Sequence, residues 1–567
     1  MDLAICGALA VLELTTLRPV READQLSTFS KLAAAFLLQY AAVKLYRIVL
    51  YPAFFSPLRH LPGPQDNHPF LGQELHRYRA AGPTDLELSW MRQWPSAPFI
   101  RVLSVAGQET LLVNSLDAHR AFVQTHAYDF VKPPFFARVV RDIAGRGLLF
   151  SEGDEHRRQR RLLLGPFSAP SVRKLTPVFQ DEARRLSDVF GRAIGDKPYG
   201  SIEAVHAFSE AFMDTIGLTV LGVRLETLSS AYPVGFRELY SRMLHQGPVG
   251  NLVGLVNAFV PVRRFLPLEA NRRFLRAKRD LRTMLSDIIE KRAAALADGT
   301  FRRETGESRD ILTYMLEEAE VQRKETGEEV WTVEDIVGHL LNFTSAGHET
   351  TSTTLVWCVY VLATKHSIQD ALRAEIQQLL DKSPHPTHDE IAGLPYMHNF
   401  LQETFRLFSP GILVSRQTTR PLLIAGVSIP RGTRVELRGP TIHQNPEVWG
   451  DDAGVFDPSR WEAESGRRPA SPYALEAFLQ GPRICPGRHF ALVGIKTVLV
   501  ALVPRWRFVG VEKMKKKKLE GGEEEEEEGE GELLKDGEEQ LGRGVKPANP
   551  SLTFRPAGGL RVRFERV

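Results

Sequence analysis

The sequence predicts a mainly helical α+β fold with small β-sheets, and two features support this expectation. The longest helix-length segment begins at the capping-box pattern Thr332-Val333-Glu334-Asp335 and stays apolar to about Leu362. Because it is apolar nearly all round, this helix should cross the core. Short strand patterns come late in the chain, at residues 422–429, 434–437 and 560–564.

The overall composition is that of a globular protein with a substantial core. The chain has 567 residues, of which 43% are hydrophobic and 25% charged, with a net charge of +3. This balance argues against a nucleic-acid partner, which would require a strongly basic face. The three cysteines, Cys6, Cys358 and Cys485, are too sparse for a disulfide framework, so most of the chain is expected in a reducing compartment.

Residues 1–56 are expected to form an N-terminal membrane-anchor region. Residues 3–14 are apolar but short, whereas residues 32–55 reach the roughly 20 residues that span a bilayer. The second stretch carries Lys44 and Arg47, whose long side chains can reach the interface and predict a cytosolic location for the remainder of the chain. Which stretch is the anchor, or whether both insert, stays open. The alternative is a cleaved signal peptide followed by a surface helix.

Residues 57–567 are expected to form the catalytic domain, beginning with the proline-rich spacer 57–64. The segment at about 513–544 contains a lysine run and a glutamate run, and this composition cannot bury enough apolar surface to order itself. We expect a disordered insertion there. It interrupts the domain, because apolar patterning resumes at Leu552.

The most informative segment is a ten-residue loop, Phe478-Leu479-Gln480-Gly481-Pro482-Arg483-Ile484-Cys485-Pro486-Gly487. Cys485 precedes a helix-like run, where the helix dipole and free N–H groups favour a thiolate. Gly481 and Gly487 would let the backbone approach a flat ring closely. Arg483 is placed to pair with an acidic group on such a ring.

These ten residues match every fixed position of the pattern Phe-x-x-Gly-x-Arg-x-Cys-x-Gly, with Phe478 as the first. In this loop the sequence resembles the cytochrome P450 family, whose fold places a long central helix over the haem. The resemblance implies haem b as cofactor, with Cys485 as the axial ligand of its iron.

A second motif, Ala346-Gly347-His348-Glu349-Thr350-Thr351, lies in the middle of the long apolar segment. A hydroxyl within a helix can bond the carbonyl one turn back, and an acid beside an alcohol suits proton delivery. The motif resembles the family's oxygen-activation motif, with Glu349 and Thr350 as the catalytic pair. It is no zinc-binding HExxH helix, because Ser352 stands where the second histidine would be.

Glu403 and Arg406 are three residues apart, so they share a helix face, and their apolar neighbours suggest burial. The resemblance implies that Arg460 completes a structural triad with them. It also implies that Arg483, Arg416 and Arg160 bind the haem propionates. His156 stands where the family usually has tryptophan, and its ring can still donate a hydrogen bond.

The resemblance places substrate contacts over the haem, and these residues are mostly apolar, which favours a lipophilic substrate. They are Phe343, Ala346, Gly411, Ile412, Val414 and Leu552.

By this resemblance, the chain is a monooxygenase that inserts one atom of O2 into a lipophilic compound by hydroxylation or epoxidation, in secondary metabolism among other contexts. NADPH would act indirectly, through a separate NADPH-cytochrome P450 reductase, with cytochrome b5 as a second donor. Arg488 and Lys496, beside the ligand loop, could dock such an acidic partner. Anchored in membrane lipid, the enzyme would lie at the endoplasmic reticulum with its catalytic domain in the cytosol.

Two alternatives remain open at this stage. One is an isomerase or dehydratase of the same family that uses no dioxygen, and the presence of Glu349 and Thr350 argues against it. The other is a haem-binding sensor or carrier without turnover. NADPH-dependent oxygen uptake would exclude the first, and a product identified by mass spectrometry would exclude the second.

Overall fold

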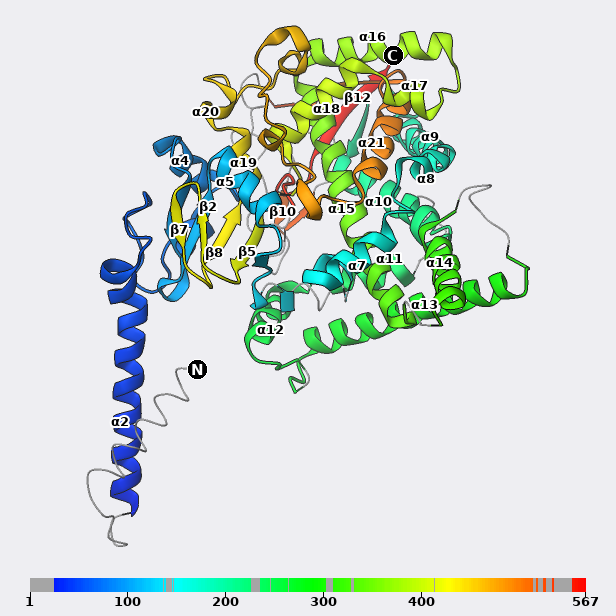
Figure 1. Ribbon diagram of the computed structural model, residues 1–567. Coiled ribbons are helices and arrows are strands. Elements are labelled where there is room, and N and C mark those ends of the chain that lie inside the picture. The colour runs from blue at the N-terminus through cyan, green and yellow to red at the C-terminus, as the bar shows by residue number, and fades with distance from the viewer. Residues whose placement is uncertain are drawn as a thin grey trace.

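In the computed structural model, a broad helical body lies beside a smaller β-sheet region, from which one long helix extends (Figure 1). This arrangement confirms the predicted mainly helical fold. The structure describes residues 25–135, 137–138, 145, 147–225, 235–244, 246–263, 265–301, 309–327, 331–411, 413–512, 516–518, 524–526, 533–534 and 553–567.

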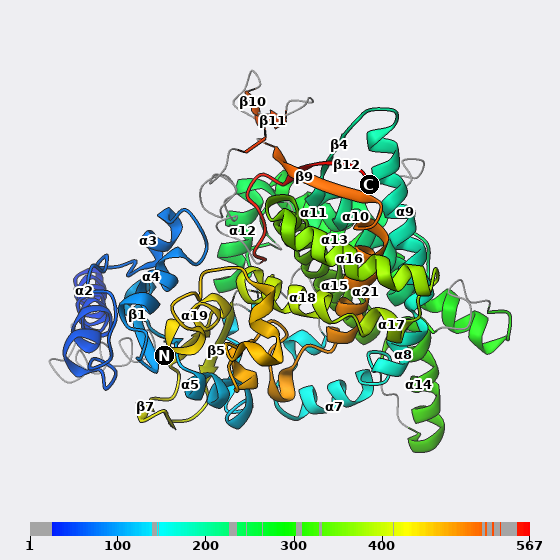
Figure 2. The same ribbon diagram turned by 90° about the horizontal axis from the view of Figure 1, so that it is seen from above.

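Helix α15, Val333–Thr364, is the central element, and its predicted capping box is confirmed. Thr332 Oγ1 accepts from the N–H of Asp335, whose carboxylate accepts from the N–H of Thr332. Most of its residues are buried, as expected for a helix apolar on nearly all sides. Figure 2 shows α15 inside the helical body, where it contacts α10 (Ala204–Ile216), α18 (Pro395–Phe408) and α21 (Arg488–Leu502).

The other helices surround this centre or cover the sheet region. They are α3 (Glu74–Arg79), α4 (Asp85–Gln93), α5 (Leu116–Arg120), α7 (Gly153–Leu163), α8 (Ala169–Lys174), α9 (Thr176–Ile194), α11 (Gly235–Leu244), α12 (Gly247–Phe259), α13 (Glu269–Ala297), α14 (Ile311–Thr326), α16 (His366–Lys382), α17 (His388–Ala392), α19 (Gly439–His443) and α20 (Pro446–Trp449).

The larger sheet has the strand order β1-β2-β8-β5-β3 and a second sheet has the order β4-β12-β9. Within both sheets all pairs are antiparallel except β2 with β8. The strands are β1 (Phe99–Leu103), β2 (Glu109–Val113), β3 (Phe130–Val131), β4 (Gly200–Glu203), β5 (Val414–Thr418), β8 (Arg434–Leu437), β9 (Trp506–Glu512) and β12 (Arg561–Arg566).

Residues 422–429, expected as one strand, form a hairpin of β6 (Leu422–Ile424) and β7 (Val427–Ile429). The turn between them holds Ala425 at φ 48° and Gly426 at φ 77°. Two consecutive left-handed residues reverse the chain tightly, so the apolar pattern continues across a change of direction.

The N-terminal region consists of α2 (Gln25–Leu45) and a wider helical turn, η2 (Tyr46–Phe55). Within it, Ala33–Phe55 is long and apolar enough to cross a bilayer and, apart from Pro52, has no buried residue, which suits a membrane anchor. The alternative stretch, residues 3–14, lies outside the described residues.

The end of η2 is docked on the sheet region. Arg101 donates a guanidinium hydrogen bond to Pro52 O at 2.6 Å. A Cβ at Gly107, whose φ is 68°, would lie 2.4 Å from Ile48 O, so only glycine allows this approach.

The expected insertion falls between β9 and β12, which are neighbours in one sheet. Most of residues 513–544 lie outside the described residues. The described parts include β10 (Lys516–Lys518) and β11 (Glu524–Glu526), which pair with each other in antiparallel register.

Candidate active site

Cys485 lies two residues before Gly487, the N-cap of α21. The N–H of Cys485 donates to Phe478 O at 2.8 Å, which closes the loop on itself. Burial raises the pKa of the Cys485 thiol, whereas the N–H of Gly487 and the charge of Arg160 act to lower that pKa. The residue is nevertheless accessible to solvent. Its thiol therefore borders open space although protein surrounds it.

The two loop glycines serve different purposes. Gly481 has φ 70°, and a Cβ there would lie 2.3 Å from Val123 O. The backbone of Val123 therefore already requires glycine at this position. A Cβ at Gly487 would lie 3.8 Å from Cys485 Sγ, an ordinary contact. The Phe478 ring packs edge-on against Phe405, with centroids 5.1 Å apart.

Arg416 and Arg483 come from distant segments but line one small cavity together with Val414. Burial and the neighbouring charge of Arg483 lower the pKa of Arg416 to about 10. The Arg416 guanidinium donates to Ser415 O at 3.0 Å. Arg483 forms an ion pair with Glu152.

Lys132 joins this cluster, and sequence reasoning missed it. Its Nζ donates to Glu152 at 3.1 Å, and burial together with Arg416 lowers its pKa to about 7. The cluster thus gathers the basic groups of Lys132, Arg416 and Arg483 around one described carboxylate. A signal was present in the sequence, since Lys132 interrupts an apolar stretch just before two prolines.

His156 and Arg160 lie one turn apart on α7. The His156 ring is buried and shares a hydrogen bond of 3.1 Å with the Tyr128 hydroxyl through Nδ1. Burial, Arg483 and other nearby cations lower the pKa of His156 to about 4, so the ring is neutral. Arg160 is half-buried and lies within electrostatic reach of Cys485, which acts to raise the pKa of Arg160 against burial.

Glu349 and Thr350 lie midway along α15. Thr350 Oγ1 donates to Ala346 O at 2.6 Å, one turn back. Ala346 is exposed although α15 is a core helix, so this part of the helix also borders accessible space. The Glu349 carboxylate accepts a hydrogen bond from Thr553 Oγ1 at 3.0 Å.

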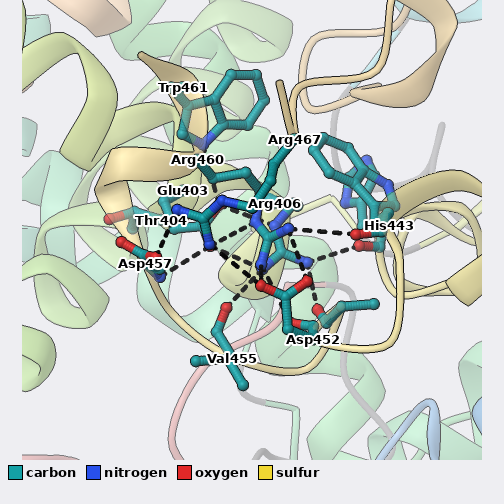
Figure 3. A network of polar contacts seen from close by, with 12 residues as sticks. Glu403, Thr404, Arg406, His443, Asp452, Val455, Asp457, Arg460, Trp461 and Arg467 are labelled. Carbon is teal, nitrogen blue, oxygen red and sulfur yellow. Dashed lines mark hydrogen bonds and ion pairs between the residues drawn. The ribbon is translucent and has the colours of Figure 1, made fainter. Parts of the chain in front are cut away.

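Glu403, Arg406 and Arg460 are fully buried and lie together, as Figure 3 shows. Arg406 donates to both oxygens of Glu403 at 2.7 and 2.8 Å, and Arg460 Nε lies 3.5 Å from Glu403 Oε1. Trp461 also donates to Glu403, and Asp452 accepts from Arg460 at 2.8 Å. Every charge in this group is therefore paired or hydrogen-bonded, as burial requires.

The expected substrate residues lie in different settings. Phe343 is buried and packs edge-on against Phe167. Gly411 is exposed and pairs with Thr553 in an antiparallel bridge, and Val414 is half-buried. Ile412 and Leu552 lie outside the described residues.

The residues present fit a haem group. A thiolate-ligated haem requires a cysteine next to accessible space, and Cys485 lies there. It also carries two carboxylates, which suit a cluster in which basic groups outnumber acidic ones. Cys485 would hold the iron, and Arg160, Arg416, Arg483 and Lys132 would hold the propionates.

A cleft of about 700 Å³ lies behind the ligand loop, bounded by α17, α18 and α21. Arg468 and Arg488 are exposed in its lining, and Glu462 is the acid among the described lining residues. Lys496, expected on this face as a docking charge, is buried instead and donates to Ala392 O at 2.7 Å. The remaining basic lining residues are His388, His398 and His489.

Comparison with known proteins gives consistent results. The family model described as Cytochrome P450 matches residues 62–524. Cytochrome P450 monooxygenase ALT8 of Alternaria alternata is 28% identical over 81% of this chain and 86% of its own length. Cytochrome P450 monooxygenase FUM15 of Gibberella moniliformis is 27% identical over 85% and 88%. The crystal structure of the cytochrome P450DA heme domain superimposes with a TM-score of 0.68 at 22% identity, covering 89% of this chain and 98% of that chain, and supports the fold.

Proposed function

The chain belongs to the cytochrome P450 family and is a cytochrome P450 monooxygenase, and from that premise we propose that it is a membrane-anchored enzyme that hydroxylates or epoxidises a lipophilic small molecule. The observation that carries the proposal is the accessible Cys485 thiol in a loop closed by its own backbone. A metal cation deprotonates a coordinating thiol, so iron would overcome the raised pKa of Cys485.

Haem, when bound, supplies the dioxygen chemistry, with thiolate ligation favouring O–O cleavage. The protein's part is to position and protonate. Thr350 presents a hydroxyl on the side of α15 that borders accessible space, and Glu349 supplies an acid next to it in sequence. We assign to this pair the delivery of protons to oxygen. This role favours a monooxygenase over a dioxygen-independent isomerase or dehydratase.

The substrate is proposed to be lipophilic and to reach the enzyme from the membrane. The largely unburied apolar stretch Ala33–Phe55 supports anchoring. Lys44 lies at the midpoint of that stretch, and Arg47 and Arg59 lie on its domain side, so the positive-inside rule favours a cytosolic domain at the endoplasmic reticulum. Several curated relatives are fungal cytochrome P450 monooxygenases, which makes secondary metabolism the context to examine first.

Electrons are proposed to come from NADPH through a separate reductase, with cytochrome b5 as a second donor. The cleft behind the ligand loop offers exposed basic side chains to an acidic partner. Changing both Arg468 and Arg488 to Glu should slow NADPH-driven haem reduction roughly 10-fold at low salt, because steering charges mainly affect the association rate. Stopped-flow reduction at several salt concentrations measures this.

The matched control changes both Arg273 and Arg276 of α13 to Glu, two exposed arginines with side chains 73% and 57% accessible. It also replaces positive by negative charge, but at positions distant in sequence from those that line the cleft. The rate of haem reduction should therefore stay unchanged. Equal effects from the control and from the cleft variants would contradict docking at this cleft.

The test of the proposed function is co-expression with a reductase in a host free of related enzymes, followed by metabolite profiling. The proposal expects NADPH-dependent oxygen uptake and a product one oxygen atom heavier than its precursor. A product formed without oxygen uptake would instead support the isomerase or dehydratase alternative.

A further inference from the structure

The carboxylate of Glu349 is held by a segment that lies 204 residues further along the chain. Thr553 Oγ1 donates to Glu349 Oε1 at 3.0 Å, and the Arg555 guanidinium lies 4.0 Å from the same oxygen. The side chains of Arg555 and Glu349 are 40% and 30% exposed, so their ion pair alone contributes little. The hydroxyl of Thr553 therefore fixes the direction of the carboxylate, and Arg555 adds a favourable charge.

The segment that carries Thr553 is itself firmly placed. Thr553 pairs with Gly411, and the N–H of Phe554 donates to Pro410 O at 3.0 Å. On the other side, Trp357 donates from its indole to Phe554 O, and the two rings stack at 5.4 Å. These contacts place Phe554 against Trp357, and its two sequence neighbours, Thr553 and Arg555, lie near Glu349.

The acid and the alcohol of α15 have different partners in this arrangement. Successive residues of a helix point about 100° apart. The Thr350 hydroxyl is bonded to Ala346 O, whereas Glu349 is bonded to Thr553. Among the described residues no hydrogen bond joins Glu349 to Thr350, so a proton passing between them needs a bridging water or a rotation of one of the two side chains.

We propose that Thr553 and Arg555 are positioning residues for Glu349, and that this C-terminal segment sets the direction in which the acid delivers its proton. The proposal rests on the oxygen-activation role assigned to Glu349 above. Since Gly411 is an expected substrate contact and pairs with Thr553, the same support serves both substrate binding and proton delivery.

The experiment uses the holoenzyme reconstituted with a reductase in lipid vesicles, with dioxygen as the probe and no added organic substrate. NADPH supplies the electrons. Two electrons and two protons convert O2 to H2O2, and four of each convert O2 to two waters. NADPH and oxygen consumed and peroxide released are measured together, so that the share of oxygen leaving as water is known.

Thr553→Val removes the hydroxyl at nearly constant volume and should lower water formation by about 2- to 10-fold, the value of one lost hydrogen bond. Peroxide should rise correspondingly. Thr553→Ser keeps the hydroxyl and should restore the wild-type ratio. In a Glu349→Gln background, Thr553→Val should add nothing further. Arg555→Met should also lower water formation. Arg555→Lys keeps the positive charge and should therefore retain most of the wild-type water formation.

Thr300→Val is the matched control, because Thr300 also donates to a carboxylate, that of Asp298, at an exposed site. Haem content and the carbon monoxide difference spectrum verify the fold of each variant. If Thr553→Val misfolds, Thr553→Ala carries the test, because the exposed ion pair of Arg555 contributes little alone.

The outcomes separate the two proposals. If Glu349→Gln raises peroxide but Thr553→Val and Arg555→Met do not, the positioning role is wrong and the role of the acid stands. If Thr553→Ser is as damaging as Thr553→Val, Thr553 acts through packing and the positioning role is again wrong. If Glu349→Gln itself matches the wild type, the assigned role of the acid fails first.

Discussion

Cys485 and Cys358 have opposite surroundings. Cys358 is buried in α15, and burial raises its pKa to about 12, whereas Cys485 borders accessible space. Cys485→Ala should therefore abolish the red-shifted Soret band that thiolate-ligated haem shows with carbon monoxide after reduction. Cys358→Ala should keep the band. A Cys485→Ala variant that retained it would contradict the assigned ligand.

Thr350 and Thr354 make the same kind of hydrogen bond, each to the carbonyl one turn back, at 2.6 and 2.9 Å. Thr354 is buried, whereas Thr350 is partly accessible. Thr350→Ala should lower product formation by about 10²–10⁴-fold, the usual contribution of proton delivery, while haem binding survives. NADPH consumed, peroxide and product are measured in one assay.

Thr354→Ala controls for the loss of a backbone-directed hydroxyl and should keep most of the activity. If the two variants lost activity equally, the effect would come from the helix and not from proton delivery.

At the level of single residues, the sequence predicts which residues carry chemistry more reliably than it predicts which residues contact each other. The ligand loop could be recognised because Cys485 and its neighbours form one short pattern. Lys132 and Glu152 were missed, because the cluster they form depends on the ion pair of Glu152 with Arg483, which is 331 residues away in the sequence. The same holds for Thr553, whose bond to Glu349 depends on how the chain folds back after the insertion.

The buried triad joins α18 to the 3₁₀ turn η7, Pro458–Trp461. Arg406 also donates to His443 O at 2.9 Å and Val455 O at 2.8 Å, so it fixes several loops at once. Arg406→Met should destabilise the fold by about 3–5 kcal/mol, because it leaves the Glu403 charge unpaired in the interior.

Thermal denaturation followed by haem absorbance measures this loss. The control is Arg158→Met, which removes an exposed ion pair to Glu155 and should cost less than about 1 kcal/mol. An Arg406→Met variant as stable as the control would show that the triad does not hold these loops together.

Among the elements, α15 could be predicted almost to the residue, because a capping box marks its start and its apolar pattern continues to its end. The prediction of one strand at 422–429 is wrong, since alternation continues through the turn of a hairpin. The expected surface position of Lys496 is also wrong. In α21 it lies on a face covered by α17, which the charge of a single residue does not reveal.

For the whole molecule, the insertion at about 513–544 joins two strands that are already paired. Glu512, the last residue of β9, faces Arg561 of β12, and its carboxylate also binds Arg563 at 2.8 Å. Replacing 513–544 by a short Gly/Ser linker should leave haem content nearly unchanged, because loop length has only a small effect on closure entropy. The carbon monoxide difference spectrum per mole of protein measures it.

The control is a Gly/Ser linker of the same length as the insertion. It separates the effect of the insertion's composition from the effect of its length. Loss of haem in both linker variants would mean that the insertion sequence itself supports the fold.

With Ala33–Phe55 as the proposed anchor, the close contact between Gly107 and Ile48 would fix the orientation of the domain relative to the membrane. A helix joined to its domain by a slack tether would let the domain roll over the bilayer surface, whereas a docked joint transmits the tilt of the helix to the whole body. Encounters with the proposed reductase in the same bilayer would then be a two-dimensional search. Each partner would diffuse laterally with a fixed orientation relative to the membrane. Fewer encounters would then have an unproductive orientation.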